Sequence, residues 1–109
     1  MNRSPFPIAA ALLLSLGGGG AAAQSADPAR GEALVRTNCA ACHAIGASGA
    51  STNPRAPAFR DLHRRYPVEQ LSEALAEGIV TGHADMPAFQ LNTQQIDDLI
   101  AYLRSLERR

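Results

Sequence analysis

The chain has 109 residues, of which 46% are hydrophobic and 5% aromatic, and its ten acidic residues balance ten basic residues, all of them arginine. This length allows one small domain and excludes a multidomain enzyme. A formal charge of zero gives no electrostatic reason to expect a nucleic-acid partner. No stretch of about 20 residues is apolar enough to span a bilayer, which argues against a membrane protein.

The first 23 residues have the features of an export signal. Arg3 supplies a positive charge, residues 8–16 form a short apolar run, and the alanines at 21–23 offer a cleavage site. We therefore expect residues 1–23 to be a cleaved signal peptide and residues 24–109 to form the mature domain, with no stable membrane insertion after cleavage. A retained anchor is disfavoured because the weakly apolar stretch has only 16 residues, four of them consecutive glycines.

The mature chain is short for a core built from side chains alone. A domain of 86 residues buries about 60–65% of its unfolded surface, and this chain has no tryptophan to add a large aromatic side chain. We therefore expect another group to complete the core. The two cysteines allow one disulfide in an exported protein, but their spacing points to a different use.

The first predicted helix covers residues 29–38. Asp27 can accept hydrogen bonds from the free N–H groups of the first turn, and Pro28 fits the first helical position. Gly31 lies inside this helix, where glycine costs about 1 kcal/mol relative to alanine. Such a position indicates close approach of another backbone. Residues rich in Gly, Ser, Ala and Pro follow from 44 to 57 and predict a loop.

Further helical segments are predicted towards the C-terminus. A short helical turn is expected at residues 58–64, and a helix at 67–77 with Val68, Leu71 and Leu75 facing inward. Gly78 is expected to follow this helix as its C′ glycine.

The last predicted helix begins after Asn92, which can form a capping box with Gln95. Asp97 and Asp98 in its early turns and Arg104 near its end suit the helix dipole. No segment alternates like a strand, so the predicted fold class is all-α. The apolar stripe of this helix consists of Ile96, Leu99, Ile100, Leu103 and Leu106.

Residues 39–43 read Cys-Ala-Ala-Cys-His, the C-x-x-C-H pattern of c-type haem attachment. Two thiols three residues apart on a helical turn lie on one side of the chain, so each can form a thioether with one haem vinyl group. The next residue is then placed to ligate the iron. We therefore predict one covalently bound haem c, attached at Cys39 and Cys42, with His43 as an axial iron ligand.

Three other uses of the cysteines fit the pattern less well. A thioredoxin-like redox motif would follow a strand, whereas a helical segment precedes this one. A zinc site needs four ligands, and His63 and His83 stand 20 residues apart rather than at zinc-site spacing. A disulfide across two intervening residues would close a very small loop and restrict the unfolded chain little.

Met86 is the only methionine left after signal removal, and it lies in a loop 43 residues beyond His43. Because it precedes Pro87, its backbone favours an extended conformation that can point the side chain inward. We predict Met86 as the second axial ligand, whose thioether raises the redox potential. His83 in the same loop is the rival ligand. Contact with a haem propionate and plain solvent exposure are the alternatives for His63 and for the arginines at 55, 60, 64 and 65.

With C-x-x-C-H near its start, Met-Pro in a late loop and an amphipathic terminal helix, the mature chain resembles a class I cytochrome c of the small bacterial kind. The resemblance implies three to five helices packed around one covalently attached haem, in a periplasmic protein. It also implies that the carbonyl of Pro57, rather than of Pro54, accepts a hydrogen bond from Nδ1–H of the proximal histidine and so orients the ring.

The resemblance extends to a helix crossing. Gly31 stands eight residues before Cys39, where this family has a crossing glycine, and residues 99–103 are similar to the terminal-helix motif of the family. The implied contact places Gly31 and Val35 against Leu99 and Tyr102. It gives the glycine inside the first helix a physical purpose.

The function implied is electron transfer between redox proteins, with a dehydrogenase as donor and an oxidase or reductase as acceptor, and without catalytic residues. One alternative is a cytochrome subunit of a larger exported dehydrogenase complex. Another is a haem enzyme or gas sensor, which would need an open or labile distal position in place of a firmly bound Met86.

Overall fold

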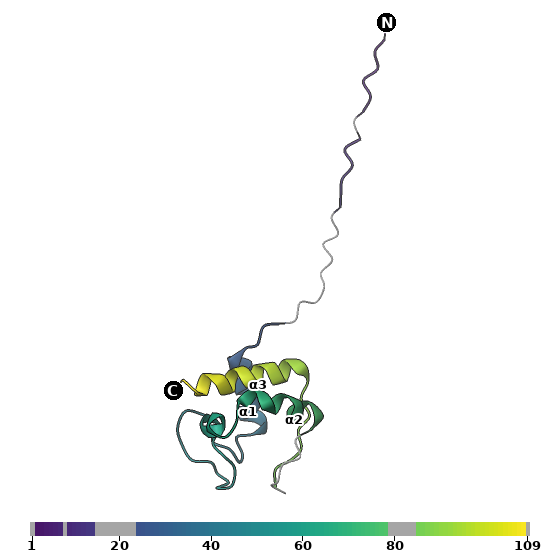
Figure 1. Cartoon of the computed structure of the whole chain (residues 1–109). Helices are drawn as coiled ribbons and strands as arrows, with labels where there is room; N and C mark the ends of the chain where they lie inside the picture. Colours follow the sequence, from purple (N-terminus) through teal and green to yellow (C-terminus); the bar gives the residue numbers. More distant parts are fainter. Residues whose placement is uncertain (1, 8, 15–23, 79–84, 109) are drawn as a thin grey trace.

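The computed structural model describes residues 2–7, 9–14, 24–78 and 85–108. Within these ranges the structure contains helices and no strand, so the predicted all-α class is confirmed. The described residues before 15 run away from the helical body as an extended segment (Figure 1). The elements in chain order are α1 (Pro28–Asn38), the 3₁₀ helices η1 (Phe59–Arg64) and η2 (Val68–Gln70), α2 (Leu71–Glu77) and α3 (Thr93–Leu106).

Helix α1 begins as its capping residues predict. The side chain of Asp27 accepts a hydrogen bond from the backbone N–H of Ala29 at 2.8 Å, and Pro28 occupies the first helical position. The helix ends where the backbone N–H of Cys39 donates to the carbonyl oxygen of Val35. The haem-attachment motif therefore starts at the last turn of α1.

The predicted helix at 67–77 is divided into η2 and α2. Gln70, at the cap position of α2, keeps a helical backbone (φ −66°, ψ −16°) and makes no side-chain cap, and its N–H donates to the carbonyl of Pro67 at 3.0 Å. The tighter 3₁₀ turn thus satisfies donors that lack a capping side chain. Val68 and Leu75 are buried as expected, and Leu71 packs partly buried against the core. Gly78 directly follows the last residue of α2, as predicted, but it occupies the C-cap position rather than C′. Its φ is 93°.

Helix α3 has the predicted capping box. Asn92 accepts a hydrogen bond from the backbone N–H of Gln95, and the side chain of Gln95 accepts one from the backbone N–H of Asn92. All five residues of the predicted apolar stripe are buried, together with Tyr102 and Asp98. None of the helices in the described ranges is long and apolar enough to cross a membrane.

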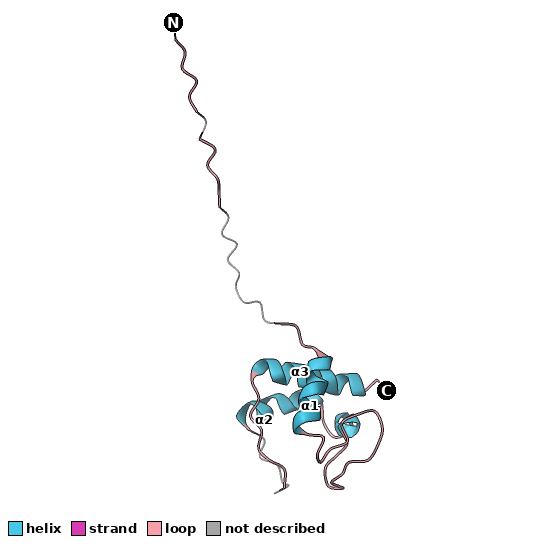
Figure 2. Ribbon diagram, turned by 180° about the vertical axis from the view of Figure 1, so that it is seen from behind, coloured by secondary structure: helices cyan, strands magenta, loops and turns pink. Residues whose placement is uncertain are grey.

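Helices α1 and α3 pack against each other (Figure 2), and Gly31 lies where they cross, as the resemblance implies. A Cβ atom on Gly31 would lie 2.0 Å from the carbonyl oxygen of Asp98 and 2.9 Å from Cβ of Tyr102. Because one of these neighbours is backbone, only a residue without a side chain fits. Val35, one turn further along α1, is fully buried. The crossing fixes the direction of α1, and so the place where the attachment motif emerges.

Candidate functional site

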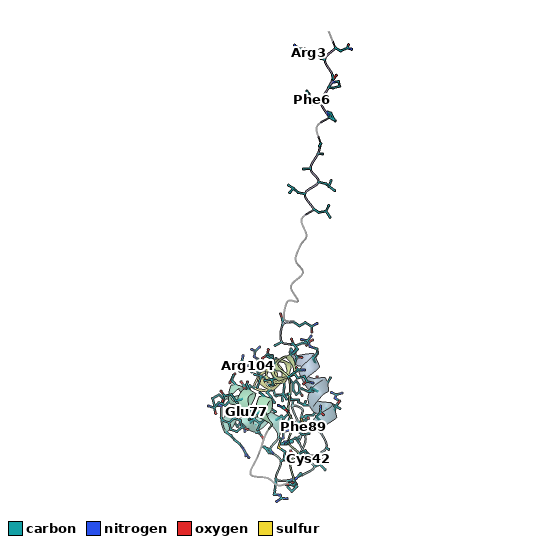
Figure 3. The ribbon with its side chains drawn as sticks, turned by 90° about the vertical axis from the view of Figure 1, so that its right-hand side faces the viewer. Arg3, Phe6, Cys42, Glu77, Phe89 and Arg104 are labelled. Carbon is teal, nitrogen blue, oxygen red and sulfur yellow. The ribbon has the colours of Figure 1, made fainter. Side chains whose placement is uncertain are left out.

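The four predicted haem-contacting side chains, those of Cys39, Cys42, His43 and Met86, line one cavity of about 620 Å³. This volume lies within the range of roughly 300–1,000 Å³ that is usual for ligand and cofactor sites. Figure 3 labels Cys42 in the lower part of the body, away from the N-terminal segment. Apolar side chains from four helical elements form much of the wall, among them Leu34, Phe59, Leu62, Leu71, Leu75, Leu99 and Leu103.

The attachment motif is wound into a single turn after α1. The backbone N–H groups of Cys42 and His43 both donate to the carbonyl oxygen of Cys39, at 3.2 and 3.0 Å. This turn brings three reactive side chains to the same cavity wall. No disulfide joins the two cysteines, and burial raises the pKa of the Cys39 thiol to about 11. A buried, protonated thiol differs from the redox-active cysteines of thioredoxin-like motifs, whose pKa values are lowered.

The imidazole of His43 is oriented by a backbone carbonyl. Its Nδ1 atom lies 2.7 Å from the carbonyl oxygen of Pro57, the contact that the resemblance implies. Because a carbonyl oxygen only accepts, Nδ1 must carry the proton, which leaves the lone pair on Nε2 for a metal. The ring of Phe59 lies beside the imidazole, with 4.8 Å between ring centroids and a tilt of 43°. The backbone N–H of Phe59 donates to the carbonyl oxygen of Ala44 at 2.9 Å and so closes the loop of residues 44–58 that contains Pro57.

Met86 is half-buried on a loop between α2 and α3 and lines the same cavity. Its neighbour Asp85 accepts hydrogen bonds on one carboxylate oxygen from Asn53 Nδ2 at 2.9 Å and from Arg55 Nη2 at 3.0 Å. At the other end of the loop, Leu91 N–H donates to a carbonyl of α2. The contacts of Asp85 with Asn53 and Arg55 were not predicted, because the composition of the loop that contains Asn53 and Arg55 does not predict its conformation.

The remaining sequence candidates are divided between the cavity lining, other parts of the structure and residues that the structure does not describe. His83 falls outside the described residues. His63 is half-buried on η1, away from the cavity lining, and its Nδ1 has no hydrogen-bond partner in the described part of the chain. Of the four arginines, Arg55 and Arg65 line the cavity, whereas Arg64 pairs with Asp61. Within the described ranges no three His, Cys, Asp or Glu side chains gather as metal ligands, so nothing there favours the zinc alternative.

Comparison with known proteins identifies the family. The sequence model of cytochrome c matches residues 28–107, which include the attachment motif, the cavity loops and all helices. The chain belongs to the cytochrome c family.

Two relatives match this chain over most of both sequences. It is 32% identical over 95 residues to cytochrome c-552 of Bradyrhizobium diazoefficiens, which covers 87% of this chain and 89% of the relative. It is 32% identical over 81 residues to a cytochrome c-553-like protein of Synechocystis, covering 73% of this chain and 70% of the relative. A third, the cytochrome c subunit of the Corynebacterium diphtheriae cytochrome bc1 complex, is 35% identical over 85 residues, which cover only 27% of that longer chain.

Membership of the cytochrome c family means a covalently bound haem c and a role in electron transport, and the predicted resemblance to a small bacterial class I cytochrome c is confirmed. The residues of the cavity fit this group. Two unbridged thiols, an imidazole held with Nε2 available and a thioether share one largely apolar space. These are the donor types that c-type haems use.

Proposed function

We propose that this protein is a periplasmic monohaem cytochrome c that carries one electron at a time, with His43 and Met86 as the axial ligands of the iron. The observation that carries the proposal is the meeting of Cys39, Cys42, His43 and Met86 on one cavity, although Met86 is 43 residues distant from His43 in the chain. Such a set holds a haem covalently and supplies a donor for each of its two faces.

Each residue has a distinct task in this proposal. Cys39 and Cys42 hold the macrocycle through thioethers, and His43 donates through Nε2 while Pro57 fixes the plane of its ring. Met86 donates a neutral thioether, which favours the ferrous state and raises the potential. When bound, the haem supplies an iron that alternates between the ferric and ferrous states.

The apolar wall of the cavity supports rapid electron transfer. Leucine side chains of α1, α2 and α3 line the cavity. A haem bound there would have apolar neighbours, so little solvent beside it would have to reorganise when its charge changes. No acid, base or nucleophile is required of the protein. We therefore propose that it serves other redox proteins, taking electrons from a dehydrogenase and passing them to an oxidase or reductase.

The periplasmic location rests on residues 1–23, which we propose are removed as a signal peptide to leave a domain of residues 24–109. The described residues of this segment make no core; Phe6, for example, is 94% exposed. N-terminal sequencing of the protein from a periplasmic fraction should begin at Gln24. A mature chain that retains Arg3 would contradict the assignment.

The substitution Met86→Leu tests the distal ligand. Leucine keeps the volume and removes the sulfur, so the oxidised holoprotein should lose the weak far-red charge-transfer band of methionine-ligated ferric haem. The midpoint potential should fall, and cyanide should bind faster. Absorption spectra, a redox titration and the rate of cyanide binding measure these three effects. Phe89→Leu is the control, because it alters the same cavity wall from the same loop without removing an iron donor.

The outcomes separate the alternatives. A wild-type low-spin spectrum without the far-red band would assign the distal position to a second histidine, such as His83. A high-spin wild type that binds CO or cyanide at once would favour the haem enzyme or gas sensor. Either result contradicts ligation by Met86.

A second candidate is a cytochrome subunit of a larger complex. The similarity to the cytochrome c subunit of a cytochrome bc1 complex favours it, although the match covers about a quarter of that relative. Affinity purification from native membranes and periplasm distinguishes the two. A free carrier elutes alone at the size of one domain, whereas a subunit co-purifies in stoichiometric amount with its enzyme.

A further inference from the structure

Asp85 ties the loop that carries Met86 to a second loop of the cavity lining, which contains Asn53 and Arg55. One carboxylate oxygen of Asp85 accepts from Asn53 Nδ2 at 2.9 Å and from Arg55 Nη2 at 3.0 Å. All three residues line the cavity. Asp85 is 32 positions from Asn53 and 30 positions from Arg55 in the chain. We call these three residues the loop latch.

The Asn53 end of the loop latch is anchored at the attachment motif. The backbone N–H of Asn53 donates to the carbonyl oxygen of Cys42 at 3.1 Å, and its Oδ1 accepts from the backbone N–H of Arg55 at 3.0 Å. These two hydrogen bonds fix the backbone of Asn53 and the oxygen of its side-chain amide. The nitrogen of the same amide donates to Asp85. A continuous series of contacts thus joins Cys42, beside His43, to the residue that precedes Met86.

The far end of the same loop is tied to α2. The backbone N–H of Leu91 donates to the carbonyl of Leu75 at 2.9 Å, and the side-chain amide of Gln90 donates to the carbonyl of Ala76 at 3.2 Å. Met86 lies between this attachment and the loop latch. Loss of the contacts with Asn53 and Arg55 would weaken the attachment of the loop next to Met86, which favours conformations with the sulfur turned away.

We propose that Asn53 and Arg55, acting through Asp85, position Met86 as the distal ligand by joining two loops that line the cavity. This inference rests on the proposed ligation by Met86 and adds three positioning residues to it. They touch neither the iron nor an electron-transfer partner in this role. Their effect is on the fraction of molecules in which the distal sulfur is in place.

The expected effect is moderate because the ion pair is largely exposed to water. The side chains of Arg55 and Asp85 are 69% and 42% exposed. Exposed pairs of this kind shift an equilibrium by about two- to fivefold, and salt weakens them further. The Asn53 amide is an uncharged donor to the Asp85 carboxylate, so this hydrogen bond should weaken less at high salt than the ion pair with Arg55.

The test is the binding of imidazole, which competes with the methionine sulfur, to the oxidised holoprotein at one fixed pH. Asp85→Ala, which removes the hydrogen bonds from Asn53 and Arg55, should lower the dissociation constant of imidazole about fivefold. Asp85→Asn and Arg55→Gln should each lower it about twofold, and the double variant should show no further change, since both remove the same ion pair. Arg55→Lys should restore part of the wild-type value.

The chain contains a matched control. Arg64 and Asp61 form an exposed ion pair with side chains 74% and 43% exposed, outside the cavity lining. Asp61→Ala should therefore leave the imidazole dissociation constant at its wild-type value. The free energy of unfolding of each variant, measured with urea, provides the second readout. A residue with a merely structural role would change this free energy without changing the imidazole affinity of the folded protein.

The outcomes distinguish the latch from the proposed ligand. A wild type without the far-red methionine band overturns ligation by Met86 and the latch with it. A wild type with that band, but with equal imidazole affinity in Asp85→Ala, Arg55→Gln and Asp61→Ala, overturns the latch alone. An affinity that rises only in the variants of Asp85 and Arg55 supports it.

Discussion

The α1–α3 crossing and the loop of residues 85–91 both bring distant parts of the chain together, but they do so with different interactions. At the crossing, Gly31 allows backbone contact and the surrounding side chains are buried. The buried carboxylate of Asp98 is also there, and it accepts hydrogen bonds from Arg30 and from the backbone N–H of Asp27. The loop is held instead by exposed side chains and by two hydrogen bonds to α2.

The crossing should therefore determine the stability of the fold, and the loop should determine how firmly the distal ligand is held. Close-packed backbone and apolar contacts lose much free energy when they are disturbed, so changes at the crossing should affect whether the chain folds. Exposed hydrogen bonds contribute little to stability, so changes in the loop should leave the fold intact and alter what the iron contacts.

Gly31→Ala should be the most damaging small substitution at the crossing. The added Cβ would lie 2.0 Å from the carbonyl oxygen and 2.6 Å from the carbonyl carbon of Asp98, so the helices must move apart. We expect a loss of about 3 kcal/mol in the free energy of unfolding, measured with urea on the holoprotein.

Gly46→Ala is the matched control for this substitution. No atom lies within 4 Å of the Cβ it would add, and Gly46 has no positive φ. Its free energy of unfolding should stay within about 0.5 kcal/mol of the wild type. Equal stability of the two variants would contradict the account of the crossing.

Asp98→Asn should have a smaller and pH-dependent effect. Hydrogen bonding from the Arg30 side chain, with further bonds from Asp27 N–H and Gln94, lowers the pKa of Asp98 from 3.8 to about 2. A lowered pKa stabilises the fold above the unfolded value of 3.8, and this stability is lost as the pH falls towards 2. Because Arg30 is 42% exposed, the loss at pH 7 should be about 1 kcal/mol.

Unfolding measured from pH 7 to pH 2 checks this prediction. The variant should be less stable than the wild type at pH 7, and the gap should narrow below pH 4 as the wild-type carboxylate is protonated. Asp97→Asn is the control, since Asp97 is exposed on the same helix. A gap that stays constant down to pH 2 would assign the effect of Asp98 to packing rather than charge.

Local signals predicted much of the helical body from the sequence. The caps at Asp27 and Asn92 act on neighbouring residues, so their chemistry is visible in a short window. The stripe of α3 follows from the helical period. Asp98 was expected to interact with the helix dipole, and its burial against Arg30 escaped prediction, because the crossing that buries it depends on residues 68 positions away.

The site shows the same division. The motif at 39–43 predicted that Cys39, Cys42 and His43 would share one site. The resemblance to a known family supplied the contact between His43 and Pro57. The loop latch was not predicted, because an Asn, an Arg and an Asp in loops of mixed composition have no periodicity that relates them. Only the folded positions of the two loops show that they meet.

The most direct test of the central claim is the mass of the intact protein after acid–acetone extraction. The protein should be exported from a host that attaches haem to C-x-x-C-H motifs. The account predicts a red polypeptide whose mass equals residues 24–109 plus one haem, with a pyridine haemochrome spectrum typical of two thioether bonds. A folded but colourless protein, or a haem that passes entirely into the acetone, would contradict it.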